Sequence, residues 1–284
     1  MKLLHAAHVP EGDGPFPTII ALHGWGANAL DLLGLAPILH GGRALVLCPQ
    51  GPLGLADPQS RIVIGHGWFQ IASGRPPDPL EFAQASGELR EWIDEAIAKY
   101  PVDRDHIVLL GFSQGGVMAY DLFLRDPARF AGLAVLSSWL PPELVPALAP
   151  SEAMKGRPVL LMHGTTDPMV PADRAQEARD LLLPLGLAVT LREFDMGHEI
   201  SPEALRALQD EHVDVALVDI KMPGMDGMEL QEHIHRIDAQ IAVIMITAFA
   251  SVETAVRALK QGAFDYVTKP IDPERFSESL GRVR

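Results

Sequence analysis

The sequence predicts an α/β protein with a mostly parallel sheet and helices on both faces. Short apolar, strand-like runs alternate with longer segments of helical periodicity along the 284 residues. This alternation is typical of parallel sheets, because successive parallel strands need a crossover helix between them. The length suits roughly two domains. No internal repeat, low-complexity tract or long polar linker marks a boundary between them.

Apolar periodicity places the elements of the first part of the chain. The predicted strands are Pro17–Leu22, Ala44–Cys48, His106–Leu110, Ala131–Leu136, Pro158–Met162 and Leu187–Phe194. The predicted helices are Ala29–Leu39, Leu80–Lys99, Gly115–Arg125, Ala172–Leu185 and Pro202–Glu211. This order predicts a doubly wound sheet, in which ligand sites gather at the carboxyl ends of the strands.

A glycine-flanked serine lies between a predicted strand and a predicted helix. The motif Gly-Phe-Ser-Gln-Gly at 111–115 follows the apolar run His106–Leu110 and opens the helix Gly115–Arg125. A serine at such a turn takes a strained backbone conformation, and the glycines avoid clashes with the crossing strand and helix. This context predicts a nucleophile elbow that carries Ser113.

A serine hydroxyl needs a base to become a good nucleophile, and the base needs an acid to orient it. After a nucleophile elbow the acid and then the histidine follow along the chain. Asp167 comes after the strand Pro158–Met162, and His198 comes after Leu187–Phe194. The alternative for Asp167 is a turn former or helix cap. His23 and His163 precede glycines at strand ends, where we expect structural hydrogen bonds.

Acyl transfer also needs hydrogen-bond donors for the negative oxygen that develops in the transition state. The segment His-Gly-Trp-Gly-Ala-Asn at 23–28 closes an early strand, and its glycines allow backbone N–H groups to face a cavity. The backbone N–H groups of Trp25 and Gln114 are the candidates. The alternative is an ordinary glycine turn with Asn28 or Asp31 as a helix cap.

Taken together, these motifs show that residues 1–208 resemble the small α/β-hydrolases of the phospholipase/carboxylesterase family. That family includes bacterial carboxylesterases and acyl-protein thioesterases. The matching motifs are His-Gly-Trp-Gly at 23–26, Pro-Gln-Gly-Pro at 49–52, Trp-Phe at 68–69, Gly-Phe-Ser-Gln-Gly-Gly at 111–116, His163-Gly164 with Asp167, and Gly197-His198.

The resemblance implies a core without a large cap domain and a Ser113-His198-Asp167 triad that needs neither metal nor cofactor. The triad would hydrolyse short- to medium-chain carboxylic esters through an acyl-enzyme, with thioesters or lysophospholipids as alternative substrates. Trp68 and Phe69 would line the acyl pocket. Simple core packing is the other interpretation of these two aromatic residues.

The strand and helix alternation continues through the rest of the chain. Predicted strands are Val213–Asp219, Ile241–Thr247 and Phe264–Thr268, and predicted helices are Gly227–Arg236, Ser251–Gly262 and Pro273–Val283. The segment Val-Asp-Ile-Lys-Met-Pro-Gly-Met-Asp-Gly at 218–227 ends the first of these strands. Residues 209–284 resemble the response regulator receiver domain, which has a flavodoxin-like fold.

In the receiver family the matching aspartate accepts a phosphoryl group, which points to Asp219. Thr247 matches the switch hydroxyl, and Lys269 matches the lysine that contacts the acyl phosphate. Receivers also carry an acidic pair that binds Mg²⁺ at the end of their first strand, and no spare strand with such a pair precedes Val213. We therefore expect a truncated receiver that covers three strand-helix units and is inactive in phosphotransfer. The alternative is an esterase regulated by phosphorylation of Asp219.

The junction suggests that one helix serves both parts. The segment 203–208 suits the last helix of the hydrolase and equally the second helix of a receiver. In the receiver strand order, Val213–Asp219 needs a neighbour that this chain uses elsewhere. We therefore expect the hydrolase body or a second copy of the chain to cover that edge, which makes a homodimer possible. A partly disordered tail is the alternative.

The composition of the chain limits which classes of partner we expect. The formal net charge of −14 disfavours nucleic acids and anionic membranes, whose phosphates are neutralised by Lys and Arg. The single cysteine, Cys48, lies in an apolar run and is expected to be buried. The first ten residues lack a signal-like apolar stretch, so we expect a soluble, cytoplasmic protein. The remaining alternative is a non-catalytic interaction protein.

Overall fold

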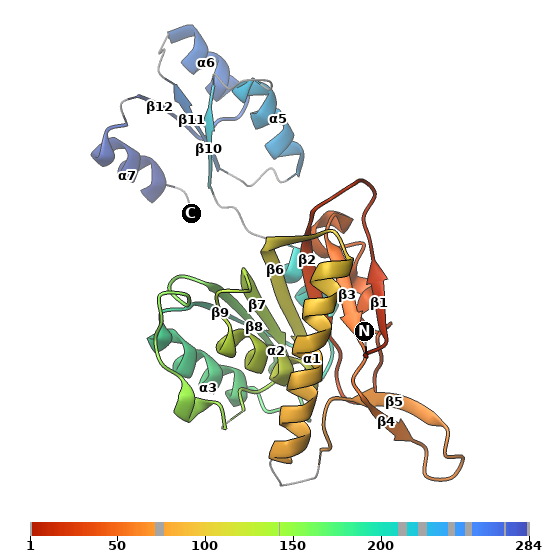
Figure 1. Ribbon diagram of the computed structural model, residues 1–284. Helices are drawn as coiled ribbons and strands as arrows, with labels where there is room; N and C mark the ends of the chain where they lie inside the picture. The colour runs from red at the N-terminus through yellow and green to blue at the C-terminus, as the bar shows by residue number, and fades with distance from the viewer. Residues whose placement is uncertain are drawn as a thin grey trace. The chain divides into compact units, whose positions relative to one another are not determined.

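The computed structural model describes residues 2–71, 77–141, 143–209, 215–220, 226–237, 242–247, 252–269 and 271–282. The chain divides into two compact units, Met1–Asp210 and Glu211–Arg284. Figure 1 shows the elements of each unit. The mixed α/β character predicted from the sequence is confirmed, with a mostly parallel central sheet in the first unit.

The first unit is organised around a seven-stranded sheet of order β1-β3-β2-β6-β7-β8-β9. Its strands are β1 (His5–His8), β2 (Phe16–Leu22), β3 (Leu45–Pro49), β6 (Val102–Phe112), β7 (Gly132–Leu136), β8 (Pro158–Gly164) and β9 (Ala188–Phe194). All neighbours pair in parallel except β1, which runs antiparallel to β3. The carboxyl ends of the parallel strands therefore meet at one edge of the sheet.

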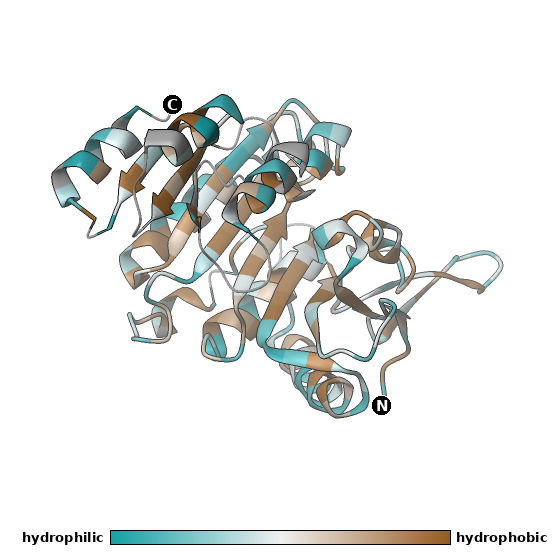
Figure 2. Ribbon diagram, turned by 90° about the horizontal axis from the view of Figure 1, so that it is seen from above, coloured by the Kyte–Doolittle hydropathy of each residue, from teal (hydrophilic) through white to brown (hydrophobic). Residues whose placement is uncertain are grey.

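Both faces of this sheet are covered. On one face, α1 (Pro79–Lys99), α2 (Gln114–Arg125) and α3 (Asp173–Leu182) pack with alternate strand residues such as Leu22 and Leu109. On the other, η1 (Leu32–Leu35), η2 (Leu39–Gly42) and α4 (Pro202–Gln209) pack with Ala21, Val46 and Leu110. Strands buried on both faces are apolar along their length, as the brown strands in Figure 2 show.

The structure corrects two expectations for the first unit. The prediction of an α-helix over Ala29–Leu39 is wrong. This segment contains turns and η1, and η2 begins at Leu39. Gly34 weakens a helix, and Pro37 has no N–H to donate and restricts the residue before it. The sequence reading also missed β1 and a hairpin of β4 (Leu53–Ala56) and β5 (Val63–Gly67).

Cys48 is buried, as expected. It lies on β3 with 2% of its surface exposed, within the cluster on the α4 side of the sheet. Burial raises the pKa of its thiol to about 12. None of the helices in the described part of the chain is long and apolar enough to span a membrane.

The second unit contains a parallel sheet of order β10-β11-β12. Its elements are β10 (Val215–Asp219), α5 (Gly227–Ile237), β11 (Ala242–Thr247), α6 (Val252–Lys260), β12 (Asp265–Thr268) and α7 (Pro273–Gly281). All six expected elements are present. In the described ranges β10 pairs with β11 alone, so its other edge has no strand beside it. Most of the loop after Asp219, including Lys221, lies outside the described residues.

Candidate active site

The turn between β6 and α2 holds Ser113 at a positive φ, with φ 52° and ψ −120°. Such a conformation is costly for a residue with a side chain and presents the hydroxyl at the tip of the turn. The neighbouring glycines are required by space. A Cβ on Gly115 would lie 2.0 Å from the Leu22 carbonyl oxygen, and one on Gly111 would lie 2.5 Å from Gly116 Cα.

Three side chains from different loops meet at this turn. His198 Nε2 lies 2.9 Å from Ser113 Oγ, and His198 Nδ1 lies 2.7 Å from Asp167 Oδ2. Asp167 follows β8 and His198 follows β9, so two adjacent parallel strands deliver the acid and the base to one edge of the sheet. The His198 ring packs against Phe112, with 5.1 Å between ring centroids. The structure therefore joins the three residues that the sequence singled out.

The Asp167 carboxylate is held in its ionised form. Burial of its side chain opposes ionisation, but hydrogen bonds outweigh burial and lower the pKa of Asp167 below its ordinary value. The donors are the backbone N–H groups of Val170 and Met169, at 2.9 and 2.8 Å from Oδ1, and the His198 ring. A carboxylate in this place orients the imidazole and stabilises its protonated form.

His163 and His23 make structural hydrogen bonds, as expected. His163 Nε2 lies 2.8 Å from the Val170 carbonyl oxygen, closer than the 3.6 Å that separates it from Asp167 Oδ2. His23 Nδ1 donates to the Gly24 carbonyl oxygen at 2.7 Å, while its Nε2 accepts from Gly51 N at 3.0 Å. Burial lowers the pKa of His23, so its ring is neutral at pH 7.

The loop at 23–28 runs beside Ser113. A Cβ on Gly24 would lie 3.3 Å from Ser113 Cβ, so the backbone that leads to Trp25 passes next to the serine. Gln114 begins α2 directly after the serine, and its N–H is one of the free donors of a helix start. The two candidate oxyanion donors thus lie on the two chain segments that flank the Ser113 side chain.

Trp68 and Phe69 lie inside the main core, each with 2% of its surface exposed. Phe69 packs edge-on against Phe82 of α1. This burial favours the packing interpretation, and a role for either ring in an acyl pocket stays a prediction. A cavity of about 450 Å³ lies instead against Trp25 and the hairpin, lined by Trp25, Gly26, Gly54, Leu55, Ala56, Ile64, Gly65 and Gln70.

Sequence reasoning missed the role of the Gln114 side chain. Its Oε1 accepts from the Trp68 N–H at 2.8 Å, and its Nε2 donates to the Phe69 carbonyl oxygen at 2.6 Å. The side chain is fully buried. A polar residue after the serine inside an apolar helix was the available signal, because a buried amide must find partners.

In the second unit, Asp219 and Lys269 form an ion pair with 2.6 Å between Oδ2 and Nζ. Thr247 ends the neighbouring strand β11 and is buried. The receiver family implies Mg²⁺ here, but the residues that the structure describes do not fit the ion. No cluster of three His, Cys, Asp or Glu residues that could hold a metal occurs among the residues that the structure describes.

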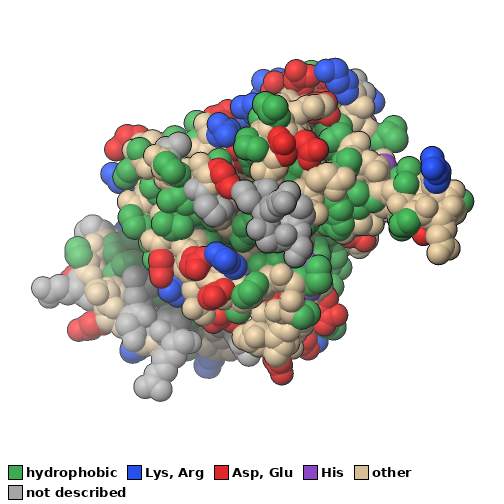
Figure 3. All heavy atoms as spheres, turned by 90° about the horizontal axis from the view of Figure 1, so that it is seen from below, with side chains coloured by type: hydrophobic (Ala, Val, Ile, Leu, Met, Phe, Trp, Pro, Cys, Tyr) green, Lys and Arg blue, Asp and Glu red, His purple; other side chains and the backbone are tan. Residues whose placement is uncertain are grey.

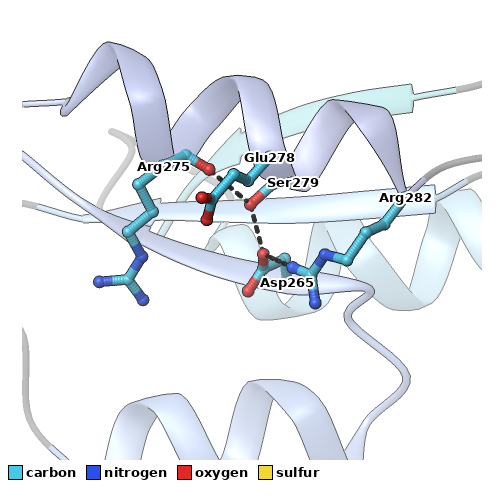
Figure 4. A pocket seen from close by; sticks show the side chains of 5 residues that line it. All are labelled: Asp265, Arg275, Glu278, Ser279 and Arg282. Carbon is cyan, nitrogen blue, oxygen red and sulfur yellow. Dashed lines mark hydrogen bonds and ion pairs between the residues drawn. The ribbon is translucent and has the colours of Figure 1, made fainter.

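The second unit also contains a cavity of about 680 Å³, shown in Figure 4. It is lined by Asp265, Arg275, Glu278, Ser279 and Arg282, and Asp265 accepts hydrogen bonds from Ser279 and Arg282. Burial opposes ionisation of Asp265, but these groups lower its pKa below the ordinary value. Asp265 and Arg282 in this lining form an ion pair, and the lining includes none of the site residues predicted from the sequence.

Comparison with known proteins matches residues 5–215 to the phospholipase/carboxylesterase family. The carboxylesterase of Bacillus cereus is 27% identical, with a TM-score of 0.62 over 73% of this chain and 92% of that chain. SOBER1 of Arabidopsis thaliana is also 27% identical, with a TM-score of 0.57 over 68% and 95% of the two chains. Esterase PE8, at 23% identity and a TM-score of 0.64 over 74% and 97%, supports the fold alone.

The C-terminal part matches the response regulator receiver domain over residues 188–280. The regulatory protein AtoC of Escherichia coli (strain K12) is 51% identical over 80 residues, which are 28% of this chain and 17% of AtoC. NtrC of Salmonella typhimurium is 42% identical over 87 residues, 31% and 18% of the two chains. The chain therefore spans less than a quarter of the length of these curated relatives.

The two family matches overlap over residues 188–215. Both family matches thus include β9 and α4. This shared segment is longer than the single shared helix that the sequence predicted. Structurally this segment belongs to the first unit, where Ala204 of α4 is buried and β9 completes the sheet. The first match covers most of the chain, which therefore belongs to the phospholipase/carboxylesterase family and is a serine hydrolase that acts on carboxylic esters.

Proposed function

We propose that residues 1–208 form a carboxylesterase domain that hydrolyses short- to medium-chain carboxylic esters with Ser113, His198 and Asp167 as its triad. The observation that carries this proposal is the continuous pair of hydrogen bonds, 2.9 and 2.7 Å long, from Ser113 through His198 to Asp167. Ser113 is 9% exposed, so the protein encloses most of this residue.

In the acylation step, Ser113 Oγ bonds to the ester carbonyl carbon while its proton moves to His198 Nε2. The carbonyl oxygen becomes negative and is stabilised by the N–H groups of Trp25 and Gln114. The bond from carbon to the alcohol oxygen then breaks, and the alcohol leaves with the proton from His198. Water repeats the sequence on the acyl-enzyme, which releases the acid and restores Ser113.

The cavity beside Trp25 supports small acyl groups as substrates. Its lining combines the apolar side chains of Trp25, Leu55 and Ile64 with three glycines. Apolar linings with few polar groups are typical of small-molecule sites. Thioesters and lysophospholipids are the second candidates, since the same acyl-enzyme chemistry serves them. Measuring kcat/KM on a butyrate ester and on the matching butyryl thioester under the same conditions shows whether the enzyme prefers esters or thioesters.

We also propose that residues 209–284 act in packing or dimerisation, and that they do not signal. Among the residues that the structure describes, no group of three His, Cys, Asp or Glu residues could hold Mg²⁺, which supports this view. Among the described residues β10 pairs with β11 alone, and this open edge favours pairing with a second copy. The test is light scattering on the full chain. A result of monomers alone contradicts the proposed dimer.

The proposed setting is the cytoplasm, with a small-molecule ester as partner and without nucleic acid or membrane partners. The net charge of −14 supports this proposal. In Figure 3 basic side chains are scattered among acidic and hydrophobic ones over the face shown.

The test is the turnover of p-nitrophenyl butyrate by wild type and Ser113→Ala. We expect the variant to lose about 10⁴-fold or more of kcat, because the nucleophile is removed. Ser151→Ala, which changes an exposed serine, is the matched control and keeps full activity. A fluorophosphonate probe labels wild type and the control but not Ser113→Ala. Substantial turnover by Ser113→Ala would sink the proposed triad.

A further inference from the structure

We propose that the side chain of Gln114 is a positioning residue that fixes the distance between the two oxyanion donors. This inference rests on the proposed function, because it takes the N–H groups of Trp25 and Gln114 as those donors. What is added is a role for the carboxamide, which bonds to the segment 66–69, the end of β5 and the bend that follows it.

The carboxamide of Gln114 bonds to the backbone of this segment at two points. It accepts from the Trp68 N–H at 2.8 Å and donates to the Phe69 carbonyl oxygen at 2.6 Å. Both bonds are buried, where water cannot replace them. The start of α2, with its backbone donor, is thereby fixed to the two residues that follow β5.

The same segment is also fixed to the loop that carries Trp25. The Trp68 indole Nε1 donates to the His23 carbonyl oxygen at 2.9 Å. The Gly26 N–H donates to the His66 carbonyl oxygen, and the His66 N–H to the Ala27 carbonyl oxygen, both at 2.8 Å. Residues 66–69 therefore form a bridge with one end on the Trp25 loop and the other on Gln114.

Close packing leaves this bridge little freedom. A Cβ on Gly67 would lie 2.6 Å from the Trp25 ring and 3.2 Å from Gln114 Oε1, so Gly67 is held between the two. A Cβ on Gly65 would lie 2.1 Å from the Gly26 carbonyl oxygen. Without the carboxamide bonds, the bridge and the elbow can shift relative to each other, which misplaces one donor from the developing oxyanion.

Gln114→Met tests the proposal, because Met has a similar volume and removes both bonds while the Gln114 backbone N–H remains. Misplacing a donor affects the transition state more than the bound substrate. We expect kcat for p-nitrophenyl butyrate, per site titrated with fluorophosphonate, to fall about tenfold to a hundredfold. KM stays within about twofold, and the inhibition constant of butylboronic acid, which forms a tetrahedral adduct with serine, rises by a similar factor.

Thr18→Val is the matched control. Thr18 is buried, and the variant removes its part-buried side-chain bond to backbone, from Thr18 Oγ1 to the Phe16 carbonyl oxygen at 2.9 Å, near the far end of β2. We expect its kcat per titrated site to equal that of wild type. Trp68→Phe is the second variant, to be used if Gln114→Met does not fold. It removes only the indole bond to His23, and we expect it to lower kcat by a smaller factor than Gln114→Met.

A wild-type kcat per titrated site in Gln114→Met overturns the inference, as does a change confined to KM. In the event that neither variant folds, equal boronate affinity in Gln114→Glu and wild type overturns it, because Glu keeps the acceptor and loses the donor. A failure of the proposed function gives a different result: the wild-type protein does not react with the fluorophosphonate probe or does not hydrolyse p-nitrophenyl butyrate.

Discussion

In the first unit, three site residues from three loops are joined by hydrogen bonds, and the segments around them are fixed by further bonds from Gln114, Trp68 and His23. In the second unit, Asp219 and Lys269 also meet, at 2.6 Å, but the described residues around them do not assemble a donor set that would hold Mg²⁺. Both sites lie at the carboxyl ends of parallel strands. The difference lies in which strands each sheet contains.

The hydrolase site draws on the loops after β2, β6, β8 and β9, all of which lie in one seven-stranded sheet. The described sheet of the second unit has three strands and leaves β10 at its edge. A site built from strand ends is complete only when every contributing strand is in place. The receiver match reaches back over β9 and α4, yet these elements pack in the hydrolase.

The largest effect is expected when the hydrolase site is inactivated without a change in its shape. Asp167→Asn keeps the side-chain volume but donates where the carboxylate accepted, so His198 takes the wrong tautomer. We expect kcat to fall by about 10³- to 10⁴-fold with little change in KM. Steady-state turnover of p-nitrophenyl butyrate measures this. A loss below tenfold contradicts the role given to Asp167.

The same variant reveals a pH dependence of stability. The folded pKa of Asp167 is depressed, so its contribution is fully present above the unfolded value of about 3.9 and is lost as pH falls through the folded pKa. Wild type should exceed Asp167→Asn in free energy of unfolding by about 1–3 kcal/mol near pH 7. That gap should shrink below about pH 4. Urea unfolding at several pH values measures it, and a gap independent of pH contradicts the assignment.

A smaller effect is expected from the hairpin that supports the Trp25 loop. In Gly65→Ala the new Cβ would lie 2.1 Å from the Gly26 carbonyl oxygen, so the two backbones must separate. We expect kcat to fall about tenfold and Tm to drop. Gly87→Ala is the matched control, since nothing lies within 4 Å of its Cβ in α1. It should leave kcat unchanged and raise Tm by about 2 °C. Equal kcat in the two variants contradicts the coupling.

The smallest effect is expected in the second unit. Asp219→Asn removes the carboxylate paired with Lys269, and we expect esterase kcat to stay within error of wild type. Acetyl phosphate with Mg²⁺ should change neither the rate nor the mass of the wild-type protein. A phosphoryl adduct on Asp219, or a rate change that Asp219→Asn abolishes, would instead support a phosphorylation-regulated esterase.

Much of the fold was predictable because its strands are buried on both faces and its helices show clear periodicity. Ser113, Asp167 and His198 were predictable as a set because each follows a strand whose direction fixes which edge it reaches. The exposed β4–β5 hairpin was not, since its strands include the exposed residues Val63 and Ile64 and show no simple alternation. In Figure 3 it projects from the body with hydrophobic side chains at its surface.

The supporting contacts of the site were not predictable either. Trp68 looked like a pocket residue because it is a large aromatic near the site in the family motif. Its burial and its bond to His23 depend on the path of the hairpin. The hydrogen bonds of Gln114 likewise depend on which strand end passes beside it, and that is set by packing among distant segments rather than by local sequence.

The burial of Cys48 has a practical consequence for spectroscopy. With its thiol pKa raised to about 12, almost no thiolate exists at neutral pH, and the side chain is 2% exposed. A cysteine introduced at an exposed position in either unit would therefore react alone with a maleimide dye or spin label. Pairs of such labels, one in each unit, give direct distances between the two units and their changes when an inhibitor occupies Ser113.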